Sequence, residues 1–270
     1  APTEFVDMSG KAFNTIFPSD FTYFENLNKI IQEEPIDAIS PEVRGAIAAI
    51  GIVKGKPFAP DERMKKLLTE AATLGNATSR VITYHPRFTG AKIYPDDPGS
   101  IWSMGFADKN TSFEANGAMG LDARVLYYFN AGGVTPAMAV TRAGVGSDYA
   151  LGLLDSNQQA FDGSKTYRLH LPPNVPVNDF WAVTVYDTQT RSQLQTGQKF
   201  PTVGSQSEGI KKNADGSYDV YFAPKAPEGK EGNWLQTVPG KSWFTILRMY
   251  GPLEPWINKT WRPGEIELVQ

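Results

Sequence analysis

Turn-forming dipeptides divide the C-terminal half of the chain into short apolar runs. The dipeptides are Asp162-Gly163, Asp215-Gly216, Pro239-Gly240 and Pro263-Gly264. Glycine accepts a left-handed backbone and proline fixes its own φ angle, so both residues favour turns over the interior of a helix or strand. A segment interrupted this often has little room for long helices, and the pattern predicts short strands.

The runs between these turns show the periodicity of strands. Tyr167, Leu169 and Leu171 alternate with polar neighbours, which is typical of a half-buried strand. Two longer runs, 180–186 and 243–250, are apolar enough to predict central strands, and residues 218–222 alternate again. Short strands joined by turns favour an antiparallel β-sandwich of the jelly-roll type.

The first half of the chain has a helical pattern. Apolar residues recur at spacings of three and four in 24–31 and 64–71, and Ser40-Pro41-Glu42 has the sequence of a helix N-terminus. Gly75-Asn76 is expected to end or kink the helix that begins near residue 61, and a further helix is expected over 121–129. The predicted fold class is therefore α+β, with a mainly helical segment at 1–145 and a β-sandwich domain at 146–270.

The charge balance bears on the possible partners. The chain has 26 Lys and Arg against 29 Asp and Glu, a formal net charge of −3. A general nucleic-acid binder normally carries a basic stripe, so we expect no nucleic-acid partner. No apolar run reaches the length of about 18 residues that a membrane span needs, so we also expect no membrane span.

Metal and redox chemistry have few possible ligands here. There is no cysteine, and the two histidines, His85 and His170, are far apart in the sequence. Thiolate chemistry and Cys-based metal sites are therefore excluded, and the expected metals and cofactors are none. Sites for Ca²⁺ or Mg²⁺ made only of carboxylates stay open.

Arg248 is the most distinctive candidate site residue. By strand alternation it shares a face with Phe244, Ile246 and Tyr250, and a guanidinium on a buried face needs a partner. Asp187, at the end of the other predicted central strand, is the expected partner. One interpretation of the pair is an ion pair that organises the fold; the other is a clamp for a substrate carboxylate.

Further candidates come from two groups of residues. His85 and Arg87 stand beside Tyr84 and could serve as a general acid or an anion site, although a His before Pro is often simply exposed. The aromatic candidates for ligand binding are Trp181, Tyr186 and Trp234, as part of an aromatic platform. The alternative is that the six Trp residues belong to the sandwich core. Of these, Trp256 and Trp261 are expected to be the most exposed, or to pack on a neighbouring domain.

Several blocks of the sequence resemble the paired bacterial families DUF1254/DUF1214. The blocks are 161–164, 167–172, 180–187, 203–205, 213–217, 233–235 and 244–250. Residues 4–11 and 50–58 are similar to the stretch that joins the two domains in long members, so the resemblance covers nearly the whole chain. The resemblance implies a C-terminal sandwich of the jelly-roll type and, as in many members, an exported or periplasmic bacterial protein. It implies no catalytic residues. It also implies that the N-terminal domain of longer members is mostly absent, so that this domain or a second copy of the chain is an expected partner.

Three functions remain open from the sequence. The first is an exported binding or assembly module, and the second is a hydrolase or lyase that acts on a small or polymeric substrate. The third is a binder of carbohydrate-type ligands. The candidates for the enzyme hypothesis are Tyr84, His85, Arg87, Asp187 and Arg248, and it requires several of them to converge in one pocket. The carbohydrate hypothesis requires at least two exposed, coplanar rings.

Overall fold

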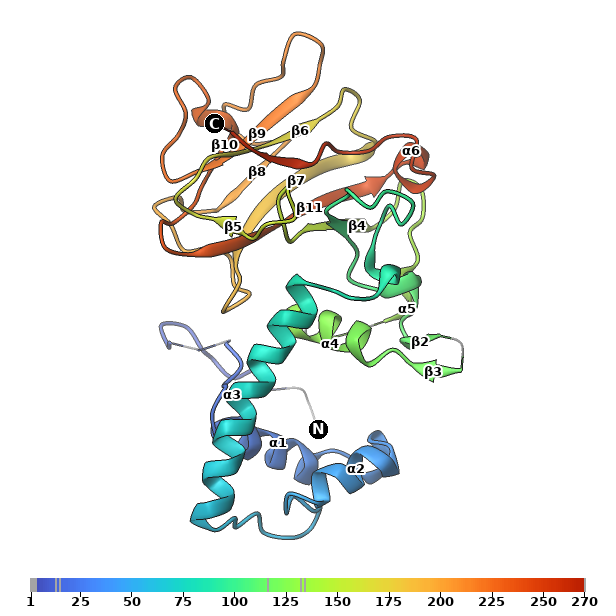
Figure 1. Cartoon of the computed structure of the whole chain (residues 1–270), viewed down its shortest axis with the longest axis vertical. Coiled ribbons are helices and arrows are strands. Elements are labelled where there is room, and N and C mark those ends of the chain that lie inside the picture. Colours follow the sequence, from blue (N-terminus) through green and yellow to red (C-terminus); the bar gives the residue numbers. More distant parts are fainter. Residues whose placement is uncertain are drawn as a thin grey trace. The chain divides into compact units, whose positions relative to one another are not determined.

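The structure is a computed structural model that describes residues 4–12, 14, 16–115, 117–131, 133 and 135–269. The chain divides into two compact units, residues 1–76 and 77–270, and the boundary falls within helix α3. The predicted division between residues 145 and 146 is a different one and stays a prediction. Figure 1 shows the helices and strands. The helices are α1 (Thr22–Glu33), α2 (Pro41–Ala48), α3 (Glu62–Tyr84), α4 (Leu121–Asn130), α5 (Pro136–Ala139) and α6 (Glu254–Ile257).

Local capping sets where the first helices begin. The Ser40 hydroxyl accepts a hydrogen bond from the Val43 N–H at 3.3 Å, with Pro41 in the first turn of α2, as the sequence predicts. Asp61 caps α3 by accepting a hydrogen bond from the Met64 N–H at 2.7 Å.

No described helix combines the length and the apolar character that crossing a bilayer would require.

Helix α3 runs through Gly75-Asn76 to Tyr84, so the expected end at that dipeptide is wrong, whereas the alternative of a kink there stays a prediction. A glycine inside a helix costs only about 1 kcal/mol, which the neighbouring turns of a long helix readily outweigh. The helix therefore continues through 79–84, the stretch in which the sequence pattern favoured neither helix nor strand.

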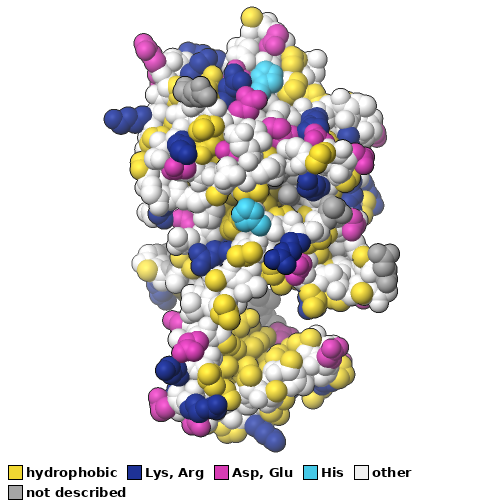
Figure 2. Space-filling model, viewed as in Figure 1, with side chains coloured by type: hydrophobic (Ala, Val, Ile, Leu, Met, Phe, Trp, Pro, Cys, Tyr) yellow, Lys and Arg dark blue, Asp and Glu magenta, His cyan; other side chains and the backbone are white. Residues whose placement is uncertain are grey.

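The first unit leaves much of its apolar surface exposed. Its buried apolar side chains, among the described residues, are those of Ile31, Ile52 and Leu68. Exposed large apolar side chains are more numerous, and Figure 2 shows them gathered over α1, α2 and the first part of α3. They include Phe17, Ile30, Ile36, Val43, Leu67 and Leu74.

The second unit contains two β-sheets and a small hairpin. The first sheet has the order β1-β4-β11-β7-β8, with β5 paired to β11, and the second has the order β10-β9-β6-β12. Neighbouring strands are antiparallel except for β9 and β10, which are parallel. The strands are β1 (Trp102–Ser103), β2 (Glu114–Ala115), β3 (Ala118–Met119), β4 (Ser147–Gly152), β5 (Phe161–Asp162), β6 (Tyr167–Leu171), β7 (Val177–Asp187), β8 (Thr202–Gly204), β9 (Tyr218–Ala223), β10 (Trp234–Gln236), β11 (Ser242–Pro252) and β12 (Ile266–Leu268).

The two sheets pack face to face around one apolar core. On β6, Tyr167, Leu169 and Leu171 are buried and alternate with half-buried residues, as the sequence predicts. Aromatic rings join the sheets: Phe222 of β9 stacks on Trp243 of β11 with centroids 4.7 Å apart. The fold thus combines helices with largely antiparallel sheets, and both sheets are open. The jelly-roll connection of the strands stays a prediction.

The predicted turns fit this packing. Gly216 has φ +87°, a conformation that residues with a Cβ rarely adopt. Gly163 meets a different demand, because a Cβ there would lie 2.1 Å from the Val238 carbonyl oxygen. The two glycines are therefore required for separate reasons, one for backbone conformation and one for close approach.

Trp256 and Trp261 are buried, so the expectation that they are the most exposed tryptophans is wrong. They are 1% and 9% exposed, respectively. The chain after β11 turns back toward the sandwich, where the Leu253 N–H donates to the Pro176 carbonyl at 2.9 Å. The Trp261 indole N–H donates to the Pro173 carbonyl at 3.2 Å, which satisfies its polar atom inside the fold.

Candidate functional site

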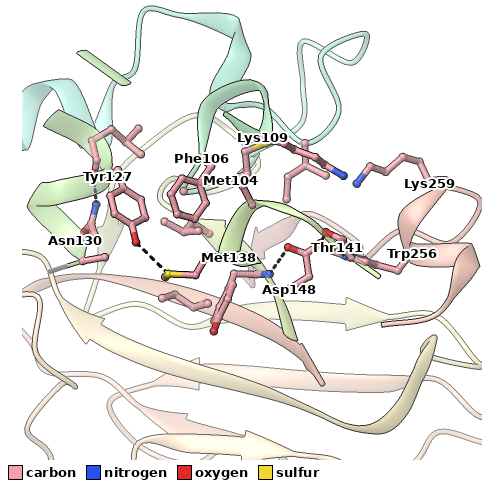
Figure 3. Close-up of a pocket in the computed structure, with 18 residues that line it drawn as sticks. Met104, Phe106, Lys109, Tyr127, Asn130, Met138, Thr141, Asp148, Trp256 and Lys259 are labelled. Atoms are coloured by element: carbon pink, nitrogen blue, oxygen red, sulfur yellow. Dashed lines mark hydrogen bonds between the residues drawn. The ribbon is translucent and has the colours of Figure 1, made fainter. Parts of the chain in front are cut away.

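A cavity of about 280 Å³ lies in the second unit, next to the sandwich core. Figure 3 shows the side chains that surround it. They come from five parts of the chain: the segment 104–109, helix α4 with the following Ala131, the segment 138–141, strand β4 and the segment 256–259, together with Ile93 and Ile246. The volume is nearly twice the roughly 150 Å³ of a cavity that accepts one benzene ring. The space therefore suits a molecule about the size of two fused rings.

Most of the cavity wall is apolar. Met104, Phe106, Leu126, Met138 and Leu151 contribute to it. The Phe106 ring stacks on that of Tyr127 with centroids 4.3 Å apart. Methionine adapts its shape to irregular ligands, because its side chain is unbranched and polarisable. Such a wall favours the apolar body of a ligand over a strongly hydrated one.

Tyr127 turns its hydroxyl away from solvent. The hydroxyl donates a hydrogen bond to the Gly133 carbonyl. It also lies 4.0 Å from the Met138 Sδ, a contact marked in Figure 3. Burial raises the pKa of Tyr127, and the neighbouring Tyr128 and Tyr149 act in the same direction. The phenol is therefore neutral near pH 7 and acts as a hydrogen-bonding part of the wall.

Asp148, at the start of β4, is the carboxylate of the cavity wall. Its Oδ2 accepts hydrogen bonds from the Thr141 hydroxyl and the Trp256 indole N–H, both at 2.9 Å. Its Oδ1 accepts the Tyr149 N–H at 2.9 Å. Neutral donors thus already satisfy this carboxylate, which forms no ion pair with any residue that the structure describes.

Two lysines stand at one end of the cavity. Lys109 ends a short 3-10 helix, Ala107–Lys109, and Lys259 follows α6. Figure 3 shows the ends of their side chains pointing toward each other. Within the described part of the chain, neither amino group forms an ion pair. The Lys259 Nζ lies 5.2 Å from the centroid of the Trp256 ring.

The electrostatics of this end favour an anion. Burial holds the pKa of Lys259 below its usual value, the charge of Lys109 lowers it further, and Asp148 opposes both effects. Both lysines also have left-handed backbones, with φ of +55° and +66°, which is uncommon for lysine. Such angles are typical of tight turns, and five other described residues with a Cβ share them, so they show how the chain turns here and do not by themselves indicate a function. A bound anion would relieve the repulsion between the two ammonium groups.

The predicted catalytic residues do not converge. His85 and Arg87 are exposed beyond the end of α3. The Tyr84 hydroxyl beside them donates to the Thr188 carbonyl at 3.1 Å, which places this end of α3 near the end of β7. Arg248 lies instead in the middle of β11.

Asp187 and Arg248 do not form the predicted pair. Asp187 lies opposite Trp243 in the β7–β11 register, whereas Arg248 lies opposite Ala182, five positions along the strand. The two side chains also occupy opposite faces of the sheet, because an odd number of positions separates them. The Asp187 carboxylate binds the Lys241 amino group at 2.6 Å instead.

The hydrogen bonds of Asp187 control its ionisation. Burial raises its pKa, but the bond to Lys241 and the backbone N–H groups of Gln189 and Thr190 outweigh burial, so the pKa lies below its ordinary value. The Gln189 N–H lies 2.7 Å from the Asp187 Oδ1. Asp187 is therefore ionised near pH 7, and its hydrogen bonds to the Gln189 and Thr190 N–H groups stabilise the loop that follows β7.

The predicted aromatic residues fall in three different environments. Trp181 is 1% exposed and packs edge-on against Tyr218, so it offers no surface to a ligand in the folded chain. Trp234 is half-buried, and its indole N–H donates to the Ala223 carbonyl at 2.8 Å. Tyr186 stacks on Phe244 on the outer face of the first sheet, the face that also carries Arg248. Of the predicted ligand-binding residues, Tyr186 and Arg248 thus share the outer face of the first sheet, four strand positions apart.

The sequence analysis missed the residues that surround the cavity. Lys109 and Lys259 stand in short polar stretches, Asp108-Lys109-Asn110 and Asn258-Lys259-Thr260, which are typical of surface turns. The only usable signal is that each lysine adjoins an Asn, a residue common in tight turns.

No group of three or more His, Asp or Glu side chains arranged to hold a metal ion occurs among the described residues.

A comparison with known protein families supports one part of the resemblance stated above. Residues 146–254 match the model of DUF1214, a family described as proteins of unknown function. This confirms the DUF1214 part of the predicted resemblance over these residues, whereas the DUF1254 part stays a prediction. Among curated proteins, none matches the chain.

Two solved structures show a distant likeness. The crystal structure of the VPA0106 protein from Vibrio parahaemolyticus aligns with 100% of this chain at 19% identity and a TM-score of 0.43. This chain spans 59% of that protein's length. An uncharacterized protein from Burkholderia cenocepacia aligns with 78% of this chain and 44% of its own, at 14% identity and a TM-score of 0.35.

Proposed function

We propose that the second unit is a binding module for a small amphipathic anion. The ligand places an apolar body of one or two rings in the cavity and an anionic group between Lys109 and Lys259. The observation that carries the proposal is the pair of ammonium groups without an ion-pair partner in the described part of the chain, at the end of an otherwise apolar cavity.

The chemistry of the wall supports binding over catalysis. The Asp148 carboxylate is occupied by three neutral donors, and Tyr127 is held as a neutral phenol. Neither group resembles a base that is free to take a proton from a substrate. The two lysines supply charge and the wall supplies apolar contact, which is what recognition of an amphipathic anion requires.

Titration calorimetry with naphthoate tests the proposal, with naphthalenemethanol as the uncharged ligand of nearly the same size. We expect naphthoate to bind more tightly, because only the carboxylate gains from the two ammonium groups. Lys109→Met and Lys259→Met should each weaken naphthoate binding by about tenfold, the usual effect of losing one charged hydrogen bond. Lys225→Met, an exposed lysine after β9, is the matched control. Equal affinity for the two ligands, or equal losses in all three variants, would refute the proposal.

Assembly through the first unit is a second candidate function. The exposed apolar side chains of α1, α2 and α3 favour it, because monomers rarely expose continuous apolar surface of this kind. The occupant we propose is a second copy of the chain. Analytical ultracentrifugation should show a dimer that Leu67→Glu, at an exposed position of α3, converts to a monomer. A wild-type chain that sediments as a monomer at high concentration would exclude it.

Export from the cytoplasm completes the proposal, and the resemblance to DUF1254/DUF1214 proteins supports it. The test is fractionation of cells that produce the protein from its natural gene. Recovery in the periplasmic or extracellular fraction would support export, and recovery in the cytoplasm alone would refute it.

A further inference from the structure

A second feature lies on the outer face of the first sheet, around Arg248. In the register of β11, Arg248 stands opposite Tyr149 of β4 on one side and Ala182 of β7 on the other. The sandwich core lies on the opposite face, where the neighbouring Leu247 and Met249 are fully buried. Arg248 is therefore a half-buried cation that points away from the core.

Aromatic rings hold the guanidinium. Its Cζ lies 4.8 Å from the centroid of the Tyr149 ring and 4.5 Å from that of the Tyr250 ring. Tyr250 in turn stacks on Phe180 with centroids 4.0 Å apart. These contacts stabilise the charge and fix the plane of the guanidinium.

Most of the hydrogen-bonding capacity of the group is unused. Of its five N–H donors, one on Nη2 reaches the Ser147 hydroxyl at 3.3 Å, and the buried Nε has no partner. In the described part of the chain, no carboxylate lies within ion-pair distance of Arg248. An unpartnered buried N–H on a cation is costly, so a fold that only needed packing here would gain by replacing it with an apolar side chain.

We propose that Arg248, with Tyr149 and Tyr250, forms a second ligand site that takes a carboxylate. A planar guanidinium presents its N–H groups as a fork that matches the two oxygens of a carboxylate, and the tyrosine rings favour a carboxylate attached to an aromatic or apolar body. This site is distinct from the lysine pair, because Arg248 does not line the cavity. Tyr149 does line it, so the two sites share one wall residue.

The test is a titration of the full chain with benzoate, followed through the Arg Nε–H signals in ¹H–¹⁵N NMR spectra. The signal that disappears in Arg248→Lys identifies Arg248. In the wild-type protein this signal should shift saturably, and the shift gives the affinity of this site alone, because benzoate also fits the cavity between Lys109 and Lys259. In a Lys259→Met background, which weakens the cavity site, Arg248→Lys should lower the benzoate affinity measured by calorimetry about tenfold, because lysine keeps the charge but lacks the fork.

Three controls separate the alternatives. Lys259→Met should leave the Arg248 shift unchanged, which distinguishes this site from the cavity and keeps the two proposals independently testable. Arg168→Met, at an exposed arginine paired with Glu267, should leave benzoate affinity unchanged. Inorganic phosphate should shift the Arg248 signal less than benzoate does. If Arg248→Lys does not fold, triple-resonance assignment of the wild-type protein identifies the signal instead. An Arg248 signal that benzoate does not move, or that phosphate moves more strongly, would overturn the carboxylate assignment.

Discussion

The sandwich core and the cavity beside it use similar side chains for different purposes. In the core, aromatic rings such as Trp243 and Phe222 meet across the two sheets and leave no exposed surface. Around the cavity, rings such as Phe106 and Tyr127 also stack, but they surround open space and two cations that form no ion pair with a carboxylate among the described residues. The comparison teaches that residue type alone does not separate structure from function here. What separates them is whether the chain's own side chains fill the space between the rings, and whether its own carboxylates pair with the nearby cations.

The largest expected effect on stability comes from the core. Leu169→Ala removes a fully buried side chain of β6, and we expect a loss of about 3 kcal/mol in the free energy of unfolding, as for other large-to-small core substitutions. Urea unfolding followed by tryptophan fluorescence measures it. The naphthoate affinity of the folded variant should stay unchanged. A loss below about 1 kcal/mol would show that this region is not the tightly packed core described above.

Asp187 should have the next largest effect, and its effect should depend on pH. Asp187→Asn removes the charge that binds Lys241, and we expect a loss of about 2 kcal/mol at pH 7, typical of hydrogen bonds to a charged group. Because the folded-state pKa lies below the ordinary 3.8, the unfolded chain takes up the proton first as the pH falls. The stabilisation is therefore complete above about pH 4 and is lost as the pH falls through the folded-state pKa.

Urea unfolding of both proteins at several pH values checks this prediction. The difference in unfolding free energy between wild type and Asp187→Asn should shrink as the pH falls below 3.8. Comparison of the two proteins removes the contribution of the other carboxylates. A difference that does not vary with pH would contradict the proposed role of the charge.

The cavity should show the reverse pattern, with a large effect on binding and a small one on stability. Lys259→Met removes a charge that burial and Lys109 disfavour, so we expect the free energy of unfolding to stay within about 0.5 kcal/mol of wild type or to rise. Thermal unfolding with and without naphthoate measures both properties. The wild-type protein should gain thermal stability from naphthoate, and the variant should gain less. A clear loss of stability without ligand would give Lys259 a structural role instead.

The smallest effect is expected at an exposed ion pair. Arg168 and Glu267 lie 3.0 Å apart between β6 and β12, with side chains 42% and 55% exposed. Solvent and salt screen such pairs, so Arg168→Met should change stability by less than about 1 kcal/mol. Urea unfolding at low and high salt measures it. A larger loss that persists at high salt would mean that the edge strand β12 depends on this pair.

The strands could be predicted because one face of each is buried. Alternation in 167–171 and 218–222 reflects a core on one side only, and the structure places Leu169 and Val220 in that core. Helix α3 was predicted correctly at its start but not at its end, because Asp61 caps the first turn, whereas Gly75 is too weak a breaker to end a long helix. Local signals were reliable where a residue acts on its own neighbours.

The sites were harder to predict from the sequence, because they depend on the register between strands and on the paths of loops. Arg248 was identified as unusual from its position in an apolar strand, but its partner was wrong, since a sequence does not show that Arg248 aligns with Ala182 and not with Asp187. Lys109 and Lys259 are 150 positions apart in the numbering, and they meet only because two turns fold toward one cavity. No periodic pattern links such residues.

The central claim is that the cavity binds the apolar body of an anion whose charged group lies between Lys109 and Lys259. A crystal structure of the full chain with naphthoate tests it most directly. The account predicts density for the rings in contact with Phe106 and Met138, and for the carboxylate within hydrogen-bond distance of both lysine amino groups. An empty cavity at a ligand concentration that saturates binding in calorimetry, or naphthoate bound with its carboxylate away from both lysines, would contradict it.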